Sequence, residues 1–262
     1  MDFATASGVS RVDVGRFVGE VPDGWQQGRG AFGGMVLAML LRAIERSEPD
    51  AGRTTRALTG DLCGPVLPGP IEIVVEALRR GNNLSNFDAR LIQGAEVQAR
   101  ASAVLSVPRP QVRAPAPSPP SVADWRELSD LGVGPPIAPV FCAHFEYRSL
   151  SATPFAATGE PSVQGFLRLR APPPRLDAPA MVALLDAWWP AIFAVEGRPR
   201  PVATVSFTAE LLAPPEELSP AEPLYYRGRV AAVSDGFCVE FRELWSAGRL
   251  VALNQQTFAV LK

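Results

Sequence analysis

The pattern of hydrophobic and polar positions divides the chain into two similar halves. In each half, a segment that alternates between apolar and polar residues comes before a long apolar segment, and four further alternating segments follow it. Alternation with period two is typical of β-strands with one buried face. A segment that is apolar on all sides is typical of a buried helix. We therefore expect an internal duplication, with a buried helix and four following strands in each copy.

The predicted elements of the first half are strands over 10–21, 54–63, 70–78, 83–92 and 98–107, and a helix from about 31 to 47. Those of the second half are strands over 140–148, 165–170, 202–212, 224–233, 237–246 and 250–261, and a helix over 178–195. Glycine and proline turns separate the strands at hairpin-like spacing, so we expect mainly antiparallel sheets. The predicted fold class is α+β.

A proline-rich stretch near the middle of the chain marks the boundary between the halves. Residues 108–121 contain repeated prolines, which favour an extended, semi-rigid linker. A short helical turn is expected over 122–131. The predicted organisation is an N-terminal unit over 1–107, a linker over 108–139 and a C-terminal unit over 140–262.

The apolar segment 178–195 contains a single ionisable side chain, Asp186, and Asp177 before it is a plausible N-cap. A buried carboxylate is costly unless it is hydrogen-bonded or protonated. Asp186 is therefore either a core residue that caps a neighbouring loop or a catalytic carboxylate in a pocket wall. The segment is long enough for a membrane span, but Asp186 and Pro190 near its centre argue against one.

Composition excludes several classes of function. The net charge of −2 leaves no basic surplus for nucleic-acid binding. Three scattered cysteines predict neither a disulfide framework nor a zinc site. The N-terminus lacks the basic start and apolar run of a signal peptide, which favours a cytoplasmic location. The only histidine, His144, lies in an alternating run where a structural role is expected, and a Ser-His-Asp site would have to use it.

Glycines cluster around the start of the first helix. The loop 24–30 leads into Gly33 and Gly34, where another backbone or a ligand could approach exposed N–H groups. These glycines form neither a Walker nor a Rossmann fingerprint. They either provide close packing of the helix or donate hydrogen bonds to a substrate. No metal or cofactor is expected.

Short motifs in both halves point to one family. Gly30-Ala31-Phe32-Gly33-Gly34-Met35-Val36 opens the first helix, Gly64-Pro65 marks a turn, and residues 76–82 end a strand. The second helix around Asp186 is followed by 202–205 and then by 250–256. In order and spacing these segments resemble the double hotdog acyl-CoA thioesterases related to bacterial thioesterase II. The resemblance spans nearly all of the chain outside the linkers. It implies a tandem hotdog fold, with two antiparallel sheets each wrapped around a long central helix.

The resemblance also implies a catalytic site. In that family an Asp on the second helix, a Thr on the next strand and a Gln on the last strand hold the hydrolytic water. They correspond to Asp186, Thr204 and Gln256, with Gly33 and Gly34 as candidates for substrate binding. The segment 205–210 lacks the Asp-His pair often seen in the family. Gln255 is adjacent to Gln256, and only one of the two can face the site.

The implied function is hydrolysis of a fatty or other acyl-CoA to free acid and CoA. Asp186 acts either as a general base on water or as a nucleophile. The alternatives are an acyl-CoA-binding or catalytically degenerate double hotdog, and a hotdog enoyl-CoA hydratase. The hydratase chemistry usually needs an Asp-His or His-Glu pair at the helix, and no histidine lies near Asp186 in the sequence. The resemblance further implies a homodimer or larger homo-oligomer and a role in fatty acid metabolism.

Overall fold

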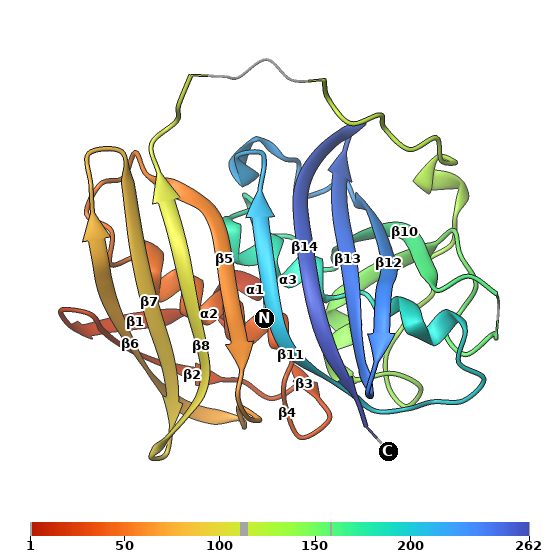
Figure 1. Ribbon diagram of the computed structural model, residues 1–262, viewed down its shortest axis with the longest axis horizontal. Helices are drawn as coiled ribbons and strands as arrows, with labels where there is room; N and C mark the ends of the chain where they lie inside the picture. Colours follow the sequence, from red (N-terminus) through yellow and green to blue (C-terminus); the bar gives the residue numbers. More distant parts are fainter. Residues whose placement is uncertain (1, 111–114, 158, 262) are drawn as a thin grey trace.

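The computed structural model describes residues 2–110, 115–157 and 159–261. Its main feature is one antiparallel sheet of 12 strands in the order β1-β2-β6-β7-β8-β5-β11-β14-β13-β12-β10-β9 (Figure 1). The prediction of two separate sheets is therefore wrong. The halves join because β5 and β11 pair with each other through their backbone groups, so that neither strand is left as an open edge.

The elements of the first half are α1 (Phe3–Ala6), β1 (Val9–Asp13), β2 (Arg16–Val21), β3 (Gln26–Gln27), β4 (Gly30–Ala31), α2 (Gly33–Glu45), β5 (Thr54–Leu62), β6 (Gly69–Arg80), β7 (Leu84–Gln93) and β8 (Glu96–Ser106). The four strands expected after the first helix are confirmed as β5 to β8. The strand expected over 10–21 is instead the hairpin β1–β2. Gly15 makes its turn with φ of +67°, a conformation that glycine adopts without steric cost.

The elements of the second half are the 3₁₀ turns η1 (Trp125–Glu127), η2 (Val140–His144), η3 (Ala191–Ala194) and η4 (Pro215–Glu217), the helix α3 (Ala178–Asp186), and the strands β9 (Phe145–Ser149), β10 (Ser162–Leu169), β11 (Val202–Leu211), β12 (Leu224–Ser234), β13 (Phe237–Ser246) and β14 (Arg249–Val260). The last four strands match their predictions closely. The strand expected over 140–148 begins only at Phe145, because η2 occupies its first part and ends at His144.

The second helix is shorter than expected. Asp177 caps its start by accepting a hydrogen bond from the Ala180 N–H, as predicted. The helix ends at Asp186 rather than near residue 195. Pro190 explains the early end, because proline has no N–H to continue the helical hydrogen bonds and restricts the residue before it. Asp186 therefore lies at the C-terminal end of α3 and not at the middle of a long helix.

The helices α2 and α3 pack against each other on the same side of the sheet (Figure 1). Contact is close near Gly34, where a Cβ atom would lie 2.9 Å from the Ala183 Cα. Both helices are almost wholly buried, and together they form the centre of the hydrophobic core. Among the described residues, no helix is long and apolar enough to cross a membrane.

The described part of the segment between the halves contains the short 3₁₀ turn η1. Residues 111–114 of the predicted linker lie outside the described residues. The helical turn expected over 122–131 is limited to η1. Trp125 of this turn packs on the cluster formed by Phe166, Tyr225 and Trp245.

Candidate active site

The candidate site lies where the end of α3 meets the start of α2. Asp186 is 8% exposed, and its Oδ2 accepts a hydrogen bond of 2.7 Å from the Gly34 N–H. This N–H belongs to the first turn of α2, whose amides have no partner within the helix. The positive end of the helix dipole favours the ionised carboxylate there. The site is thus built from both halves of the chain.

The residues predicted for the site form one hydrogen-bonded chain. Gln256 Nε2 donates to Asp186 Oδ1 at 2.7 Å and to Thr204 Oγ1 at 2.7 Å. Gln256 is fully buried, whereas Gln255 is exposed on the opposite face of β14. Thr204 therefore reaches Asp186 through the amide of Gln256. The Gln256 Oε1 atom is buried and has no hydrogen-bond partner among the described residues.

Two charged residues that the sequence analysis did not identify lie beside Asp186. Arg242 is 1% exposed, and its Nη1 lies 3.6 Å from Asp186 Oδ1 and donates to the Leu185 carbonyl at 2.9 Å. Its Nε donates to Glu240 Oε1 at 2.9 Å. The other oxygen of Glu240 accepts a hydrogen bond from the Ala191 N–H at 2.8 Å. The carboxylate of Asp186 is thus part of a buried network of three charged groups.

Burial raises the pKa of Asp186 above its usual value. The cation of Arg242 opposes this shift most strongly, followed by the hydrogen bonds from Gln256 and Gly34, while the anion of Glu240 adds to it. A carboxyl group whose pKa is raised is a stronger base once it is ionised. The site therefore holds a carboxylate suited to accept a proton.

Gly33 and Gly34 both border the carboxylate, but their N–H groups have different roles. The N–H of Gly34 is already donated to Asp186. Gly33 is the first residue of α2, so its N–H has no acceptor within the helix. A Cβ atom on Gly33 would lie 2.9 Å from Asp186 Oδ2 and 2.8 Å from Leu62 Cδ1. Glycine at this position therefore keeps the space beside the carboxylate open.

The two halves can be compared position by position through the sheet. Thr59 pairs with Thr208, and the pairing of β5 with β11 is symmetric about that point. By this symmetry Thr204 corresponds to Thr55, and a β-bulge follows each of them. Gln256 pairs with Phe207, and its counterpart Ala103 pairs with Leu58.

The counterpart of the site in the first half keeps only part of the chemistry. Glu45 ends α2 as Asp186 ends α3, and its Oε1 accepts a 2.6 Å hydrogen bond from the Thr55 hydroxyl. The glutamine amide is missing, because Ala103 stands at its position. We therefore centre the candidate site on Asp186 and not on Glu45.

Glu45 provides a prediction about stability. Burial raises its pKa to about 7 from 4.5, and the nearby Asp177 adds to the shift. A carboxyl group with a raised pKa stabilises the fold fully below pH 4.5, and this contribution is lost as the pH rises through about 7. Glu45→Gln keeps an acceptor for Thr55 and is expected to raise the free energy of unfolding at pH 8 by about 2 kcal/mol.

Urea denaturation of wild type and Glu45→Gln at pH 5 and pH 8 measures this effect. The stability difference between the two proteins is expected to be much larger at pH 8 than at pH 5. Equal differences at both values would show that Glu45 is ionised throughout this range in the folded protein.

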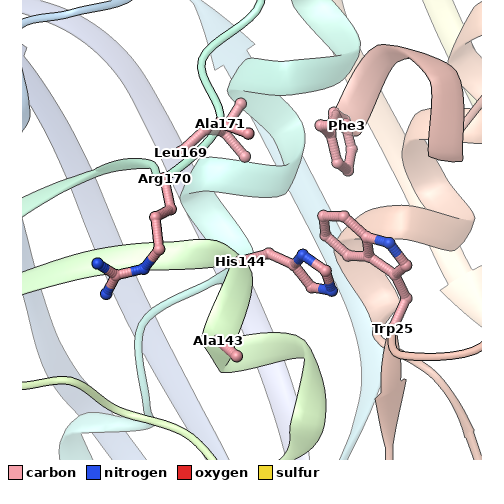
Figure 2. A pocket seen from close by; sticks show the side chains of 7 residues that line it. All are labelled: Phe3, Trp25, Ala143, His144, Leu169, Arg170 and Ala171. Atoms are coloured by element: carbon pink, nitrogen blue, oxygen red, sulfur yellow. The ribbon is translucent and has the colours of Figure 1, made fainter. Parts of the chain in front are cut away.

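His144 takes no part in the contacts of Asp186. Its Nε2 lies 2.8 Å from the Gly24 carbonyl oxygen, and its ring stacks on Trp25 with centroids 3.8 Å apart. Figure 2 shows both rings at a surface pocket of about 200 Å³, which Phe3 and Arg170 also line. The structural role expected for His144 agrees with these contacts. No group of three or more His, Cys, Asp or Glu residues suited to a metal ion occurs in the described parts of the chain.

The fold is that of the hot dog proteins. The structure is similar to a hot dog fold protein of unknown function from Alicyclobacillus acidocaldarius, with a TM-score of 0.90, 26% identity and coverage of 99% of this chain and 98% of that one. A presumed thioesterase II from Thermobifida fusca gives a TM-score of 0.84 and 25% identity over 100% and 98% of the two chains. An acyl-CoA thioesterase II from Mycobacterium marinum shares the fold, with a TM-score of 0.80 and 16% identity over 98% and 97%.

Family models assign both halves of the chain. The model for the acyl-CoA thioesterase N-terminal domain matches residues 21–106, and that for the C-terminal domain matches residues 110–260. The chain belongs to this acyl-CoA thioesterase family. No protein of curated function matches it in sequence.

Proposed function

We propose that this protein hydrolyses acyl-CoA thioesters to a free acid and CoA, with Asp186 as the general base for a water molecule. The observation that carries the proposal is the hydrogen-bonded chain Asp186–Gln256–Thr204, in which the buried Gln256 Oε1 is left without a hydrogen-bond partner among the described residues. Family membership supports the reaction class.

The unpartnered acceptor suggests how the water is held. Both hydrogens of the Gln256 amide are used by Asp186 and Thr204, so its oxygen is free to accept a hydrogen bond from water. The Thr204 oxygen accepts from Gln256, which leaves its hydroxyl hydrogen free to donate. A water molecule at this position is oriented by neutral groups, while the carboxylate of Asp186 takes its proton.

The reaction then proceeds by acyl transfer to water. The water oxygen attacks the thioester carbonyl carbon as Asp186 accepts a proton, and the negative charge moves to the carbonyl oxygen. The Gly33 N–H at the helix start is our candidate donor to this oxyanion. The intermediate collapses with cleavage of the C–S bond, and the proton passes from Asp186 to the departing CoA sulfur. This assigns Gly33 to the substrate and Gly34 to the base.

The coenzyme end of the substrate carries phosphates and needs cations near the site. Arg198 and Arg200, with Pro199 and Pro201, line a surface pocket of about 330 Å³. This loop leads directly into β11, where Thr204 lies. The alternative candidates Arg79 and Arg80 end β6. Arg80 lies in the row of Thr55, at the opposite end of the sheet from Thr204. Arg148 is occupied by Glu146 and by the Leu128 carbonyl.

Substitution of the loop arginines tests this orientation of the substrate. Arg198→Ala/Arg200→Ala is expected to raise KM for acyl-CoA about tenfold with little change in kcat, because the phosphates contact the enzyme equally in the ground and transition states. Arg79→Ala/Arg80→Ala is the matched control and is expected to leave KM unchanged. A larger rise in KM for the control pair would place the coenzyme at the other end of the sheet.

The rival functions predict different results in a direct assay. Thiol release is measured from acyl-CoAs of graded chain length. A pure acyl-CoA-binding protein would bind these compounds and release no thiol. An enoyl-CoA hydratase would add water to a 2-enoyl-CoA and leave its thioester intact. Thiol release by the wild type supports the proposal, and its absence with every acyl-CoA would overturn it.

A further inference from the structure

The buried residues Glu240 and Arg242 hydrogen-bond to the backbone before and after Asp186 in the chain. Arg242 donates a hydrogen bond to the carbonyl of Leu185, the residue before Asp186, at 2.9 Å. Glu240 accepts one from the N–H of Ala191, in the turn after α3, at 2.8 Å. Their own ion pair, at 2.9 Å, links these contacts. The pair therefore fixes the backbone around the carboxylate and places a cation beside it.

The fold itself does not require charges at these positions. Glu240 pairs with Gln256, and in the first half Phe87 pairs with Ala103, so Phe87 is the counterpart of Glu240. By the same register Arg242, which pairs with Asn254, corresponds to Ala89, which pairs with Ala101. Phe87 and Ala89 are both fully buried. The first half thus has an apolar pair at the positions where the second half has an ion pair.

A gain in folding stability does not explain the buried ion pair either. Removal of two charges from water costs several kcal/mol per ion, and a well-packed apolar pair is often as stable or more stable. The charges occur in the half that holds Asp186 and Gln256, and are absent from the half with Ala103 at the glutamine position. This distribution follows the proposed chemistry and not the packing.

We propose that Arg242, anchored by Glu240, is a positioning residue that keeps the carboxylate of Asp186 ionised and directed at the reacting water. This inference rests on the proposed hydrolytic function. Arg242 does not touch the substrate and acts only through Asp186.

The groups facing Asp186 determine the sign of the expected effects. They come from α2 (the Gly34 N–H), β14 (Gln256), β13 (Glu240 and Arg242), β12 (Tyr226) and β9 (Tyr147). Burial raises the pKa of both tyrosines well above the usual value, so they are neutral at the pH of the assay. Arg242 is the cation in this set and Glu240 the anion. Loss of the cation raises the pKa of Asp186, and loss of the anion lowers it.

The test is the acidic limb of the pH profile of kcat, where activity falls as Asp186 becomes protonated. Arg242→Gln is expected to move this limb to higher pH and to lower kcat at pH 7 at least tenfold, with recovery as the pH is raised. Glu240→Gln is expected to move the limb to lower pH. Arg242→Lys retains the charge and is expected to restore most of the limb position. A merely structural role would lower activity without moving the limb.

A variant that carries the buried residues of the first half tests the role of Arg242 in a protein that is expected to fold. Glu240→Phe/Arg242→Ala places the buried pair of Phe87 and Ala89 in the second half and is expected to fold. It is expected to move the limb upward by less than Arg242→Gln does, because the anion of Glu240 is lost together with the cation. The pKa of Asp186 is read independently from ¹³C NMR titration of its carboxyl carbon, assigned by comparison with Asp186→Asn.

The two readouts separate this inference from the proposed function. If the limb and the carboxyl titration of Arg242→Gln coincide with those of the wild type, as do those of the double variant, the role of Arg242 is overturned. If the wild type hydrolyses no acyl-CoA, the proposed function fails, and the NMR titration alone decides whether Arg242 controls the ionisation of Asp186.

Discussion

Asp186→Asn is expected to lower kcat for acyl-CoA hydrolysis about 10³-fold, the size of effect that follows loss of a general base. Asparagine has nearly the same shape, and its side-chain oxygen still accepts the hydrogen bond from the Gly34 N–H. The amide of Gln256 can turn to present its oxygen to the new NH₂ group. The buried charges of Glu240 and Arg242 still balance each other. The variant therefore removes the base and keeps the fold.

Glu45→Gln is the matched control for this substitution. It neutralises the carboxylate that ends the other central helix, beside the counterpart of Thr204. Its kcat is expected to stay within about twofold of the wild type. Both variants are compared by thiol release at saturating acyl-CoA and by circular dichroism. Hydrolysis undiminished in Asp186→Asn would exclude Asp186 as the base.

Of the site residues, only Asp186 stands out in the sequence pattern itself, as the single charge in an apolar segment. Thr204 and Gln256 look like ordinary strand residues, and they were predicted only from the resemblance to the double hotdog thioesterases. The alternation of apolar and polar residues placed most strands correctly. Pro190 indicates that α3 ends early. The predicted helix was extended to residue 195 because the residues after Pro190 are also apolar.

The ion pair of Glu240 and Arg242 was not identified because β13 reverses the usual pattern. The charged residues Glu240 and Arg242 are buried, whereas the aromatic Phe241 between them is exposed. A rule that points apolar residues inward assigns the opposite faces. The buried residues Cys238 and Leu244 share the phase of the ion pair and were the available signal for the true orientation.

The union of the two halves into one sheet depends on contacts distant in sequence. It is formed by edge pairing of β5 with β11, and each strand alone also fits a sheet of its own half. Register between strands is fixed by which side chains must face the core. Here that core includes both α2 and α3, so the pairing becomes determined only when the helices are packed together.

Gly34 lies at a close contact between α2 and α3, where there is no space for a side chain. Gly34→Ala is expected to lower the free energy of unfolding by about 2–3 kcal/mol, the usual cost of overpacking a dense core. The new Cβ atom would lie 2.9 Å from the Ala183 Cα and would overlap Phe32 Cζ. The ring of Phe32 is fully buried and stacked on Phe141, and the backbone of α3 cannot move without displacing the helix.

The same displacement reaches the active site. Separation of α2 from α3 stretches the 2.7 Å bond from the Gly34 N–H to Asp186, which favours the protonated form of the carboxyl and lowers kcat at neutral pH. The midpoint temperature of thermal unfolding is expected to fall by roughly 4–12 °C. Gly197→Ala is the control, because a Cβ there meets no atom within 4 Å. A Gly34→Ala protein as stable and active as this control would show that the helices tolerate a wider separation. It would also show that activity does not depend on the hydrogen bond from the Gly34 N–H to Asp186.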